Sequence, residues 1–203
     1  MKIICVGRNY IDHINELSNQ KPTEPVLFMK PDTSVLLKTF PFVIPDFSND
    51  VHHEVEVLVK ICKVGKSISP KFAHKYYNQI GLGVDFTARD VQSKLKEKGL
   101  PWEIAKGFDG ATVIGEFVDK DQLDNVQNIS FQLMKNDEVV QNGNTQDMLW
   151  QIDELISYIS QFFTLKIGDI IFTGTPSGVS KVNSGDVLEG FLEDKKMFGF
   201  KVL

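Results

Sequence analysis

The sequence predicts an α+β domain that is mostly β, with a few short helices. Short runs rich in β-branched and aromatic residues far outnumber stretches with apolar residues at helical spacing. Gly, Ser and Pro are spread evenly along the chain, with no repeat and no linker. At 203 residues, 42% of them hydrophobic, the chain is long enough to bury one substantial core. We therefore expect a single domain over residues 1–203, built from bent sheets.

Strands are expected wherever a short apolar run is bounded by turn residues. These segments are Ile3–Val6, Val26–Met29, Val55–Ile61, Ile80–Phe86, Ala111–Val118, Ile129–Met134, Glu138–Gln141, Ile170–Thr173, Val187–Leu192 and Met197–Val202. The polar residues Lys135-Asn136-Asp137 indicate a hairpin, and Glu193–Lys196 is expected to be the turn between the last two strands.

Helices are expected in three segments. Tyr10–Leu17 is short, and Thr87–Lys98 ends before Gly99, a residue type that commonly follows a helix. Met148–Phe163 carries apolar residues at helical spacing along its length.

Charge and composition exclude several classes of partner. The 22 basic and 27 acidic residues give a net charge of -5, so there is no electrostatic reason to expect nucleic acid as a partner. No apolar stretch approaches the length of a membrane span, and the N-terminus lacks the pattern of a targeting signal. Cys5 and Cys62 lie in apolar runs and are expected to be reduced core thiols. Together these features predict a cytoplasmic protein.

Three carboxylates form the first candidate site. Glu54 and Glu56 are two residues apart in an expected strand, so both point to one face. A solvent-facing strand edge would explain these two residues equally well. Asp85 ends another strand, just before an expected helix, which is a common place for a reactive group and also for a helix cap. Three carboxylates without His or Cys would suit Mg²⁺, Mn²⁺ or Ca²⁺ better than Zn²⁺.

Proton transfer and anion binding have candidates of their own. His13 and Glu16 are three residues apart on a helix, where a carboxylate can orient a histidine base, although such a pair is more often a simple surface contact. Arg89 and Gln92 follow Asp85, and Lys106 lies further along. The two cations could hold a substrate carboxylate beside a metal.

The chain also resembles a known family through an ordered set of motifs. These are Val6-Gly7-Arg8-Asn9-Tyr10, Glu24-Pro25-Val26-Leu27-Phe28, His53-Glu54-Val55-Glu56, Asp85-Phe86-Thr87-Ala88-Arg89-Asp90-Val91-Gln92, Gly99-Leu100-Pro101-Trp102, Ala105-Lys106-Gly107-Phe108, Gly168-Asp169-Ile170-Ile171 and Thr173-Gly174-Thr175-Pro176. In their order and coverage they resemble the short, single-domain members of the fumarylacetoacetate hydrolase family.

The resemblance implies a fold of β-strand rolls, a homodimer, and Mg²⁺ or Mn²⁺ on Glu54, Glu56 and Asp85. It implies that His13 and Glu16 position and activate a water. It further implies substrate contacts at the 2-oxo acid end of the substrate. The residues at these positions are Arg89, Gln92, Lys106 and Thr175.

The activity expected from these parts is metal-dependent C–C hydrolysis or decarboxylation of small 2-oxo acids such as acylpyruvates, fumarylpyruvate or oxaloacetate, with Lys106 as a further catalytic group. Proton transfer on the same enolate would give an isomerase, such as a 2-hydroxyhepta-2,4-diene-1,7-dioate isomerase/decarboxylase. A third alternative is a non-catalytic protein that binds a 2-oxo acid through the metal.

Overall fold

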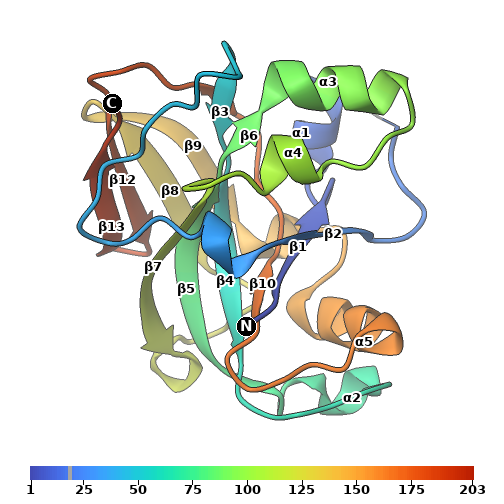
Figure 1. Ribbon diagram of the computed structural model, residues 1–203. Coiled ribbons are helices and arrows are strands. Elements are labelled where there is room, and N and C mark those ends of the chain that lie inside the picture. The colour runs from blue at the N-terminus through green and yellow to red at the C-terminus, as the bar shows by residue number, and fades with distance from the viewer. Residues whose placement is uncertain (18–19) are drawn as a thin grey trace.

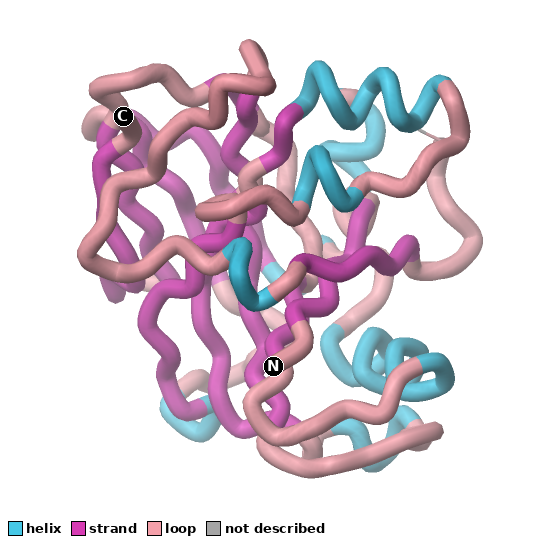
Figure 2. The backbone as a smooth tube through the Cα atoms, in the orientation of Figure 1, coloured by secondary structure: helices cyan, strands magenta, loops and turns pink. Residues whose placement is uncertain are grey.

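The computed structural model, which describes residues 1–17 and 20–203, has strands at its centre and helices at its two ends (Figures 1 and 2). The helices are α1 (Ile11–Glu16), α2 (Pro70–Ala73), α3 (Arg89–Glu97), α4 (Glu103–Lys106) and α5 (Ile152–Phe162). The strands are β1 (Ile3–Gly7), β2 (Val26–Lys30), β3 (Val51–His53), β4 (Val55–Ile61), β5 (Tyr77–Asp85), β6 (Thr87–Ala88), β7 (Thr112–Asp119), β8 (Ser130–Lys135), β9 (Glu138–Asn144), β10 (Ile170–Phe172), β11 (Ser180–Lys181), β12 (Val187–Leu192) and β13 (Lys195–Lys201). The predicted mostly-β α+β class is confirmed.

Three sheets organise these strands. The largest has the order β2-β1-β10-β4-β5-β7, and its strands are antiparallel except for the parallel pair β1 and β10. The second sheet is β11-β3-β6 and the third is β13-β12-β8-β9. Figure 1 shows α1, α3 and α4 gathered at the end of the molecule where β3 and β6 lie, with α2 and α5 at the opposite end.

The large sheet is buried on both faces, which explains why its central strands are apolar almost throughout. In β4, Val57 and Val59 belong to the main core, while Leu58 between them joins a smaller cluster with Cys5 and Phe172. Because side chains alternate along a strand, Glu56 lies on the face of Leu58. The carboxylate is therefore placed at the edge of the smaller cluster.

Two predicted helices begin later than the sequence suggested. Met148–Phe163 was wrong in its first turn: α5 begins at Ile152, where the Glu154 carboxylate accepts a 2.8 Å hydrogen bond from the Gln151 backbone N–H. Thr87–Lys98 was also wrong at its start, because Thr87–Ala88 pairs with β3 as the strand β6. In both cases contacts with distant segments hold the first residues of the predicted helix in an extended conformation, and the spacing of apolar residues does not show such contacts.

The two predicted turns had different outcomes. The hairpin at residues 135–137 is confirmed, and Asn136 and Asp137 both adopt positive φ, 54° and 66°, as a tight mirror-type turn requires. The turn at residues 193–196 is shorter than expected, because Lys195 already pairs with Leu192 in the β12–β13 ladder.

The predictions for the thiols and for membrane association can also be compared with the structure. Cys5 is fully buried as expected, but Cys62 is partly exposed, so its assignment to the core was wrong; both thiols are free. Among the described residues, none of the helices combines the length and the apolar character needed to cross a bilayer.

Candidate active site

Two adjoining strands bring the three predicted carboxylates together. Val55 of β4 lies opposite Val84 of β5, so Glu54 lies opposite Asp85, and the Asp85 backbone N–H donates a 2.9 Å hydrogen bond to the Glu54 carbonyl. Glu56 follows two residues along β4 on the same side. All three side chains are buried. The solvent-facing strand edge that could have explained Glu54 and Glu56 is thereby excluded.

Three buried or nearly buried cations compensate two of these carboxylates. The Lys106 ammonium lies 2.8 Å from Oε2 of Glu54 and 2.7 Å from Oδ2 of Asp85. Arg89 pairs with the other oxygen of Glu54, and Lys30 pairs with the other oxygen of Asp85 while also donating to the Ala111 carbonyl. Each oxygen of Glu54 and Asp85 therefore has a cationic partner.

The pKa values of Glu54 and Glu56 are shifted in opposite directions. Burial raises the pKa of Glu54, but Lys106 and Arg89 outweigh it and hold that pKa well below its usual range. Burial, together with the neighbouring Asp85 and Glu54, raises the pKa of Glu56 well above its usual range. Burial lowers the pKa of Lys106, but Asp85 and Glu54 more than reverse this and raise it to about 12.

The donor set fits a divalent cation. One oxygen from each of Glu54, Glu56 and Asp85 lies within 4.8 Å of the others, and these hard oxygen donors suit Mg²⁺ or Mn²⁺. Glu56 receives a 2.6 Å hydrogen bond from the Gly174 backbone N–H, and among the described residues no side-chain cation pairs with it. A buried carboxylate compensated by one neutral donor is an incomplete electrostatic arrangement that a bound cation would complete.

His13 and Glu16 form the predicted pair on α1. Nδ1 of His13 lies 3.2 Å from Oε2 of Glu16, and the other Glu16 oxygen accepts a 3.0 Å hydrogen bond from the Gly178 N–H. Burial lowers the pKa of His13 below 6.5, against the opposing effects of Glu54 and Glu16. With Nδ1–H donated to Glu16, Nε2 retains its lone pair as a base.

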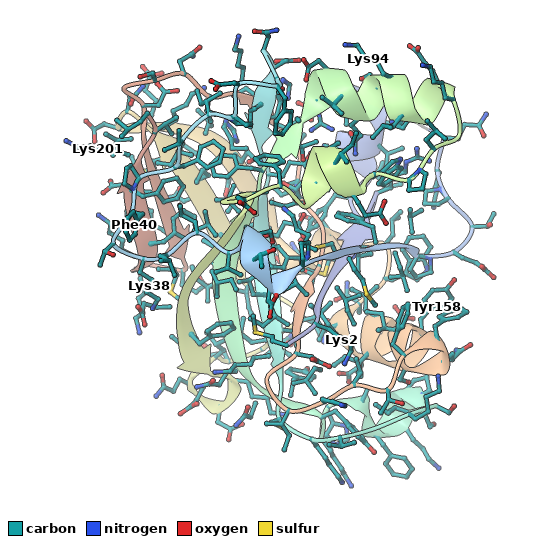
Figure 3. All side chains as sticks on the ribbon, in the orientation of Figure 1. Lys2, Lys38, Phe40, Lys94, Tyr158 and Lys201 are labelled. Atoms are coloured by element: carbon teal, nitrogen blue, oxygen red, sulfur yellow. The ribbon has the colours of Figure 1, made fainter. Side chains whose placement is uncertain are left out.

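Helix α3 presents one face to the carboxylates. Arg89 donates a 2.7 Å hydrogen bond to the Gln92 side chain, and Lys96 follows four residues after Gln92, on the same helical face. The buried Nε of Arg89 has no partner among the described residues and is a donor available to a ligand. Lys94 of the same helix points outward (Figure 3).

Thr175 is fixed by a residue that the sequence did not single out. The Gln141 amide donates to the Thr175 hydroxyl at 2.8 Å and to the Pro176 carbonyl at 3.1 Å. Its oxygen accepts from the Val55 N–H at 3.0 Å and lies 2.9 Å from Nδ1 of His53. This completely buried side chain links β4 to the loop after β10.

The predicted residues converge on one cavity of the structure. All of them line it except Glu16, which lies behind His13. The lining residues are Val6, Gly7, Arg8, His13, Leu17, Phe28, Glu54, Glu56, Asp85, Arg89, Gln92, Lys96, Trp102, Lys106 and Thr175.

Four polar residues of this site received no predicted role from the sequence: Arg8, Lys30, Lys96 and Gln141. The buried position of Lys30 in β2 could have drawn attention, because an unpaired lysine is costly in a core. Lys96 shares the helical spacing of Arg89 and Gln92. Arg8 and Gln141 reach the site only in the folded chain. Arg8 does so because it follows the end of β1, and Gln141 because it forms a hydrogen bond with the distant Thr175.

The fold and this site define a member of the fumarylacetoacetate hydrolase family. The family model described as "Fumarylacetoacetate (FAA) hydrolase C-terminal" matches residues 2–197, and the chain belongs to that family.

Individual relatives agree with this assignment. The chain is 40% identical to the mitochondrial oxaloacetate tautomerase of Bos taurus, over 98% of this chain and 90% of the relative. It is 44% identical to the mitochondrial oxaloacetate decarboxylase of Dictyostelium discoideum, over 93% of this chain and 87% of the relative. The fumarylpyruvate hydrolase of Pseudomonas aeruginosa, solved with Mn²⁺ and pyruvate, superposes with a TM-score of 0.94 at 32% identity, covering 100% of this chain and 89% of that one.

Proposed function

We propose that this protein is a divalent-metal-dependent enzyme that interconverts the keto and enol forms of oxaloacetate. The observation that carries the proposal is the buried Glu54, Glu56 and Asp85 triad in one cavity with His13. The relatives named oxaloacetate tautomerase and decarboxylase support the choice of substrate. Carbon–carbon cleavage, which the sequence suggested first, is placed second to tautomerisation as an activity of the same site.

The chain's own residues would bind the 2-oxo acid end of the substrate. Arg89 has a buried donor available at Nε, and Gln92 lies beside it in the cavity wall. The Thr175 hydroxyl accepts from Gln141 and donates only a long, 3.5 Å hydrogen bond to the Pro176 carbonyl, which a substrate oxygen could replace. These three groups would hold and orient a carboxylate in the cavity.

Proton transfer falls to the His13–Glu16 pair. A neutral His13 with a free Nε2 would accept the proton from C3 of the keto acid, and Glu16 would hold the ring in place and stabilise its charged form. In the reverse direction the same nitrogen would return the proton to C3. Lys106 would offset the negative charge that gathers on the 2-oxo oxygen. Proton exchange with water would then protonate the enolate oxygen and return His13 to its neutral form.

A divalent ion bound by Glu54, Glu56 and Asp85 would supply Lewis-acid polarisation of the 2-oxo group. Two observations support a metal ion at this place: the three carboxylates lie close together, and Glu56 is compensated by a single backbone N–H donor.

Hydrolysis of acylpyruvates is the second candidate. It is favoured by the anchoring of Glu16 to the Gly178 N–H, which fixes His13 as a base that could equally activate a water. The likeness to a fumarylpyruvate hydrolase supports the same candidate.

The test is a panel of 2-oxo acids assayed with Mg²⁺ or EDTA. Oxaloacetate tautomerisation is followed by loss of enol absorbance, decarboxylation by pyruvate formation, and acetylpyruvate hydrolysis by acetate release. The proposal expects metal-dependent tautomerisation to be the fastest of the three. Faster acetylpyruvate hydrolysis would favour the second candidate, and binding without turnover of any acid would favour a non-catalytic binding protein.

The homodimer and the cytoplasmic location stay predictions. Leu37, Phe40 and Val43 are large apolar residues exposed on the loop after β2, and they are candidates for burial against a second copy. Light scattering of the purified protein would measure the oligomeric state.

A further inference from the structure

Two cations line the cavity in addition to those that pair with Glu54 and Asp85. Arg8 follows β1, and Lys96 lies near the end of α3. Both line the same cavity as the carboxylate triad, and both are partly exposed, whereas the triad, Lys106 and Thr175 are buried. Arg8 and Lys96 therefore lie toward the solvent side of the cavity.

The conformation of Arg8 is held by its neighbour. Arg8 adopts φ of 60°, which is unfavourable for a residue with a side chain. Asn9 fixes this conformation, because its amide donates to the Thr173 carbonyl at 2.8 Å and the Trp150 carbonyl at 3.1 Å, and its oxygen accepts from the Trp150 N–H at 2.9 Å. A strained residue held this firmly at a cavity wall suggests a use for its side chain.

The position of Lys96 follows from helical spacing. Arg89, Gln92 and Lys96 are separated by three and four residues, so all three lie on one face of α3, and all three line the cavity. Lys94, on another face, is exposed and points away (Figure 3). Lys96 is thus the solvent-side member of a row that begins at Arg89.

Charge balance indicates what this end of the cavity would bind. Lys30, Lys106 and Arg89 pair with Glu54 and Asp85, so three positive charges balance the three carboxylates. Arg8 and Lys96 add two further positive charges to the cavity wall, against the one carboxylate of Glu16 behind His13. A cavity with this excess, and with a divalent ion still to be added, favours a dianion over a monoanion.

We propose that Arg8 and Lys96 bind the second carboxylate of a four-carbon 2-oxo dicarboxylate and so select it over acylpyruvates with an uncharged far end, such as acetylpyruvate. The assignment rests on the proposed function, because it takes the triad end of the cavity as the place of the 2-oxo acid group. Arg8 can accept the carboxylate with two parallel N–H donors, and Lys96 adds a third contact.

This contact also bears on the fate of the bound acid. Decarboxylation breaks the C3–C4 bond, sends its electron pair into the enolate, and releases C4 as neutral CO₂. Cations at the C4 carboxylate stabilise the charged ground state and so oppose that loss. Tautomerisation only moves a proton from C3 to the oxygen on C2, and C4 keeps its charge throughout. The two cations would therefore favour tautomerisation over decarboxylation.

The test compares Arg8→Met and Lys96→Met with wild type, and uses Lys94→Met as the matched control from the same helix. Each enzyme is assayed at saturating Mg²⁺ with oxaloacetate and with acetylpyruvate. Loss of a charge-assisted hydrogen bond should lower the ratio of kcat/KM for oxaloacetate to that for acetylpyruvate by about 10- to 100-fold in Arg8→Met. Lys96→Met should lower it in the same direction, and Lys94→Met should leave it within about twofold of wild type.

A binding measurement keeps this test independent of turnover. Malate and lactate differ by one carboxylate, and both are titrated by calorimetry into the Mg²⁺-loaded wild type and variants. Arg8→Met and Lys96→Met should weaken the binding of malate more than the binding of lactate. Arg8→Met should also raise the fraction of oxaloacetate that is decarboxylated to CO₂. An unchanged substrate ratio, an equal loss of malate and lactate, or an unchanged share of CO₂ in both variants would overturn the assignment. Wild type that turns over neither acid but prefers malate would instead reject the proposed function and retain the dicarboxylate site.

Discussion

The buried amide of Gln141 donates a 2.8 Å hydrogen bond to the hydroxyl of Thr175, across 34 residues of sequence. The same amide holds the Pro176 carbonyl, so the cavity wall formed by this loop depends on a side chain from β9. The hydroxyl of Thr175 itself donates only a long hydrogen bond, 3.5 Å to the Pro176 carbonyl, so a ligand oxygen could take this proton instead. Gln141 is therefore a positioning residue, which acts through Thr175.

Gln141→Leu and Thr175→Val should each lower kcat/KM for oxaloacetate by about 10-fold, the cost of one hydrogen bond to a charged group. Because both changes remove the same interaction, the double variant should lose little more than either single variant. Gln161→Leu, the same change at an exposed position of α5, is the control. Fully additive losses would contradict the coupling, and thermal unfolding of each variant separates the coupling from general destabilisation.

His13→Ala should lower turnover by roughly 10²- to 10⁴-fold, the usual effect of losing a positioned base, with Mg²⁺ affinity nearly unchanged. Since burial lowers the pKa of His13 below 6.5, its neutral form persists through neutral pH, and the wild-type rate should fall only as the solution becomes more acidic than that. Exposed His74→Ala is the control. A His13→Ala enzyme at near wild-type rate would place the base elsewhere.

Lys106→Met should have opposite effects on metal binding and on turnover. The ammonium lies 2.8 Å and 2.7 Å from Glu54 and Asp85, so removing its charge should make the carboxylates attract a divalent cation at least several-fold more strongly. Turnover should nevertheless fall, because the charge on the 2-oxo oxygen loses its partner. Mg²⁺ calorimetry and steady-state rates, with Lys94→Met as control, test both effects. Weaker Mg²⁺ binding would show that Lys106 supports the metal site rather than competing with it.

The stability of the fold should depend on pH through His53. Burial lowers its pKa to about 4 from an ordinary value of 6.5, so between these values the unfolded chain binds more protons than the folded one. The contribution of His53 to the free energy of unfolding is therefore complete above pH 6.5 and is lost as the pH falls toward 4. At pH 5 the loss is about 2 kcal/mol. Urea unfolding at pH 7 and pH 5 in EDTA measures this. His53→Gln should reduce the difference without removing it, because burial also lowers the pKa of His13 and His52, and an equal slope in that variant would assign the difference to other groups.

The three carboxylates were predicted to lie together partly from their spacing and partly from the resemblance to the family. Glu54 and Glu56 share a strand face by their spacing, and Asp85 ends a strand that pairs with theirs. The resemblance to the family then joined them to His13, Glu16, Arg89, Gln92, Lys106 and Thr175, which the structure brings to one cavity or its immediate support.

What escaped prediction depends on contacts between distant segments. Strands of two or three residues, such as Thr87–Ala88, have too few positions to show alternation and exist because β3 lies beside them. From the sequence alone, Lys30 looks like an ordinary polar residue at the end of a strand. Its ion pair with Asp85 forms only when the fold brings β2 and β5 together. The strain at Arg8 likewise depends on Asn9 reaching loops more than 140 residues away.

Glu56 allows metal dependence of catalysis to be tested with little disturbance of the other charges. Unlike Glu54 and Asp85, it has no side-chain cation among the described residues, so Glu56→Gln removes a carboxylate without leaving a buried lysine or arginine unpaired. The new amide oxygen can still accept from the Gly174 N–H. This makes it a cleaner probe of metal binding than Glu54→Gln or Asp85→Asn, each of which should also abolish Mg²⁺ binding and turnover.

The measurement is the rate of oxaloacetate tautomerisation by EDTA-treated protein as Mg²⁺ is added back. We expect almost no rate without Mg²⁺, saturable recovery in wild type, and recovery of Glu56→Gln only at Mg²⁺ concentrations at least about 10-fold higher. A wild-type rate that is complete in EDTA, or a Glu56→Gln enzyme with the same Mg²⁺ dependence as wild type, would contradict this expectation.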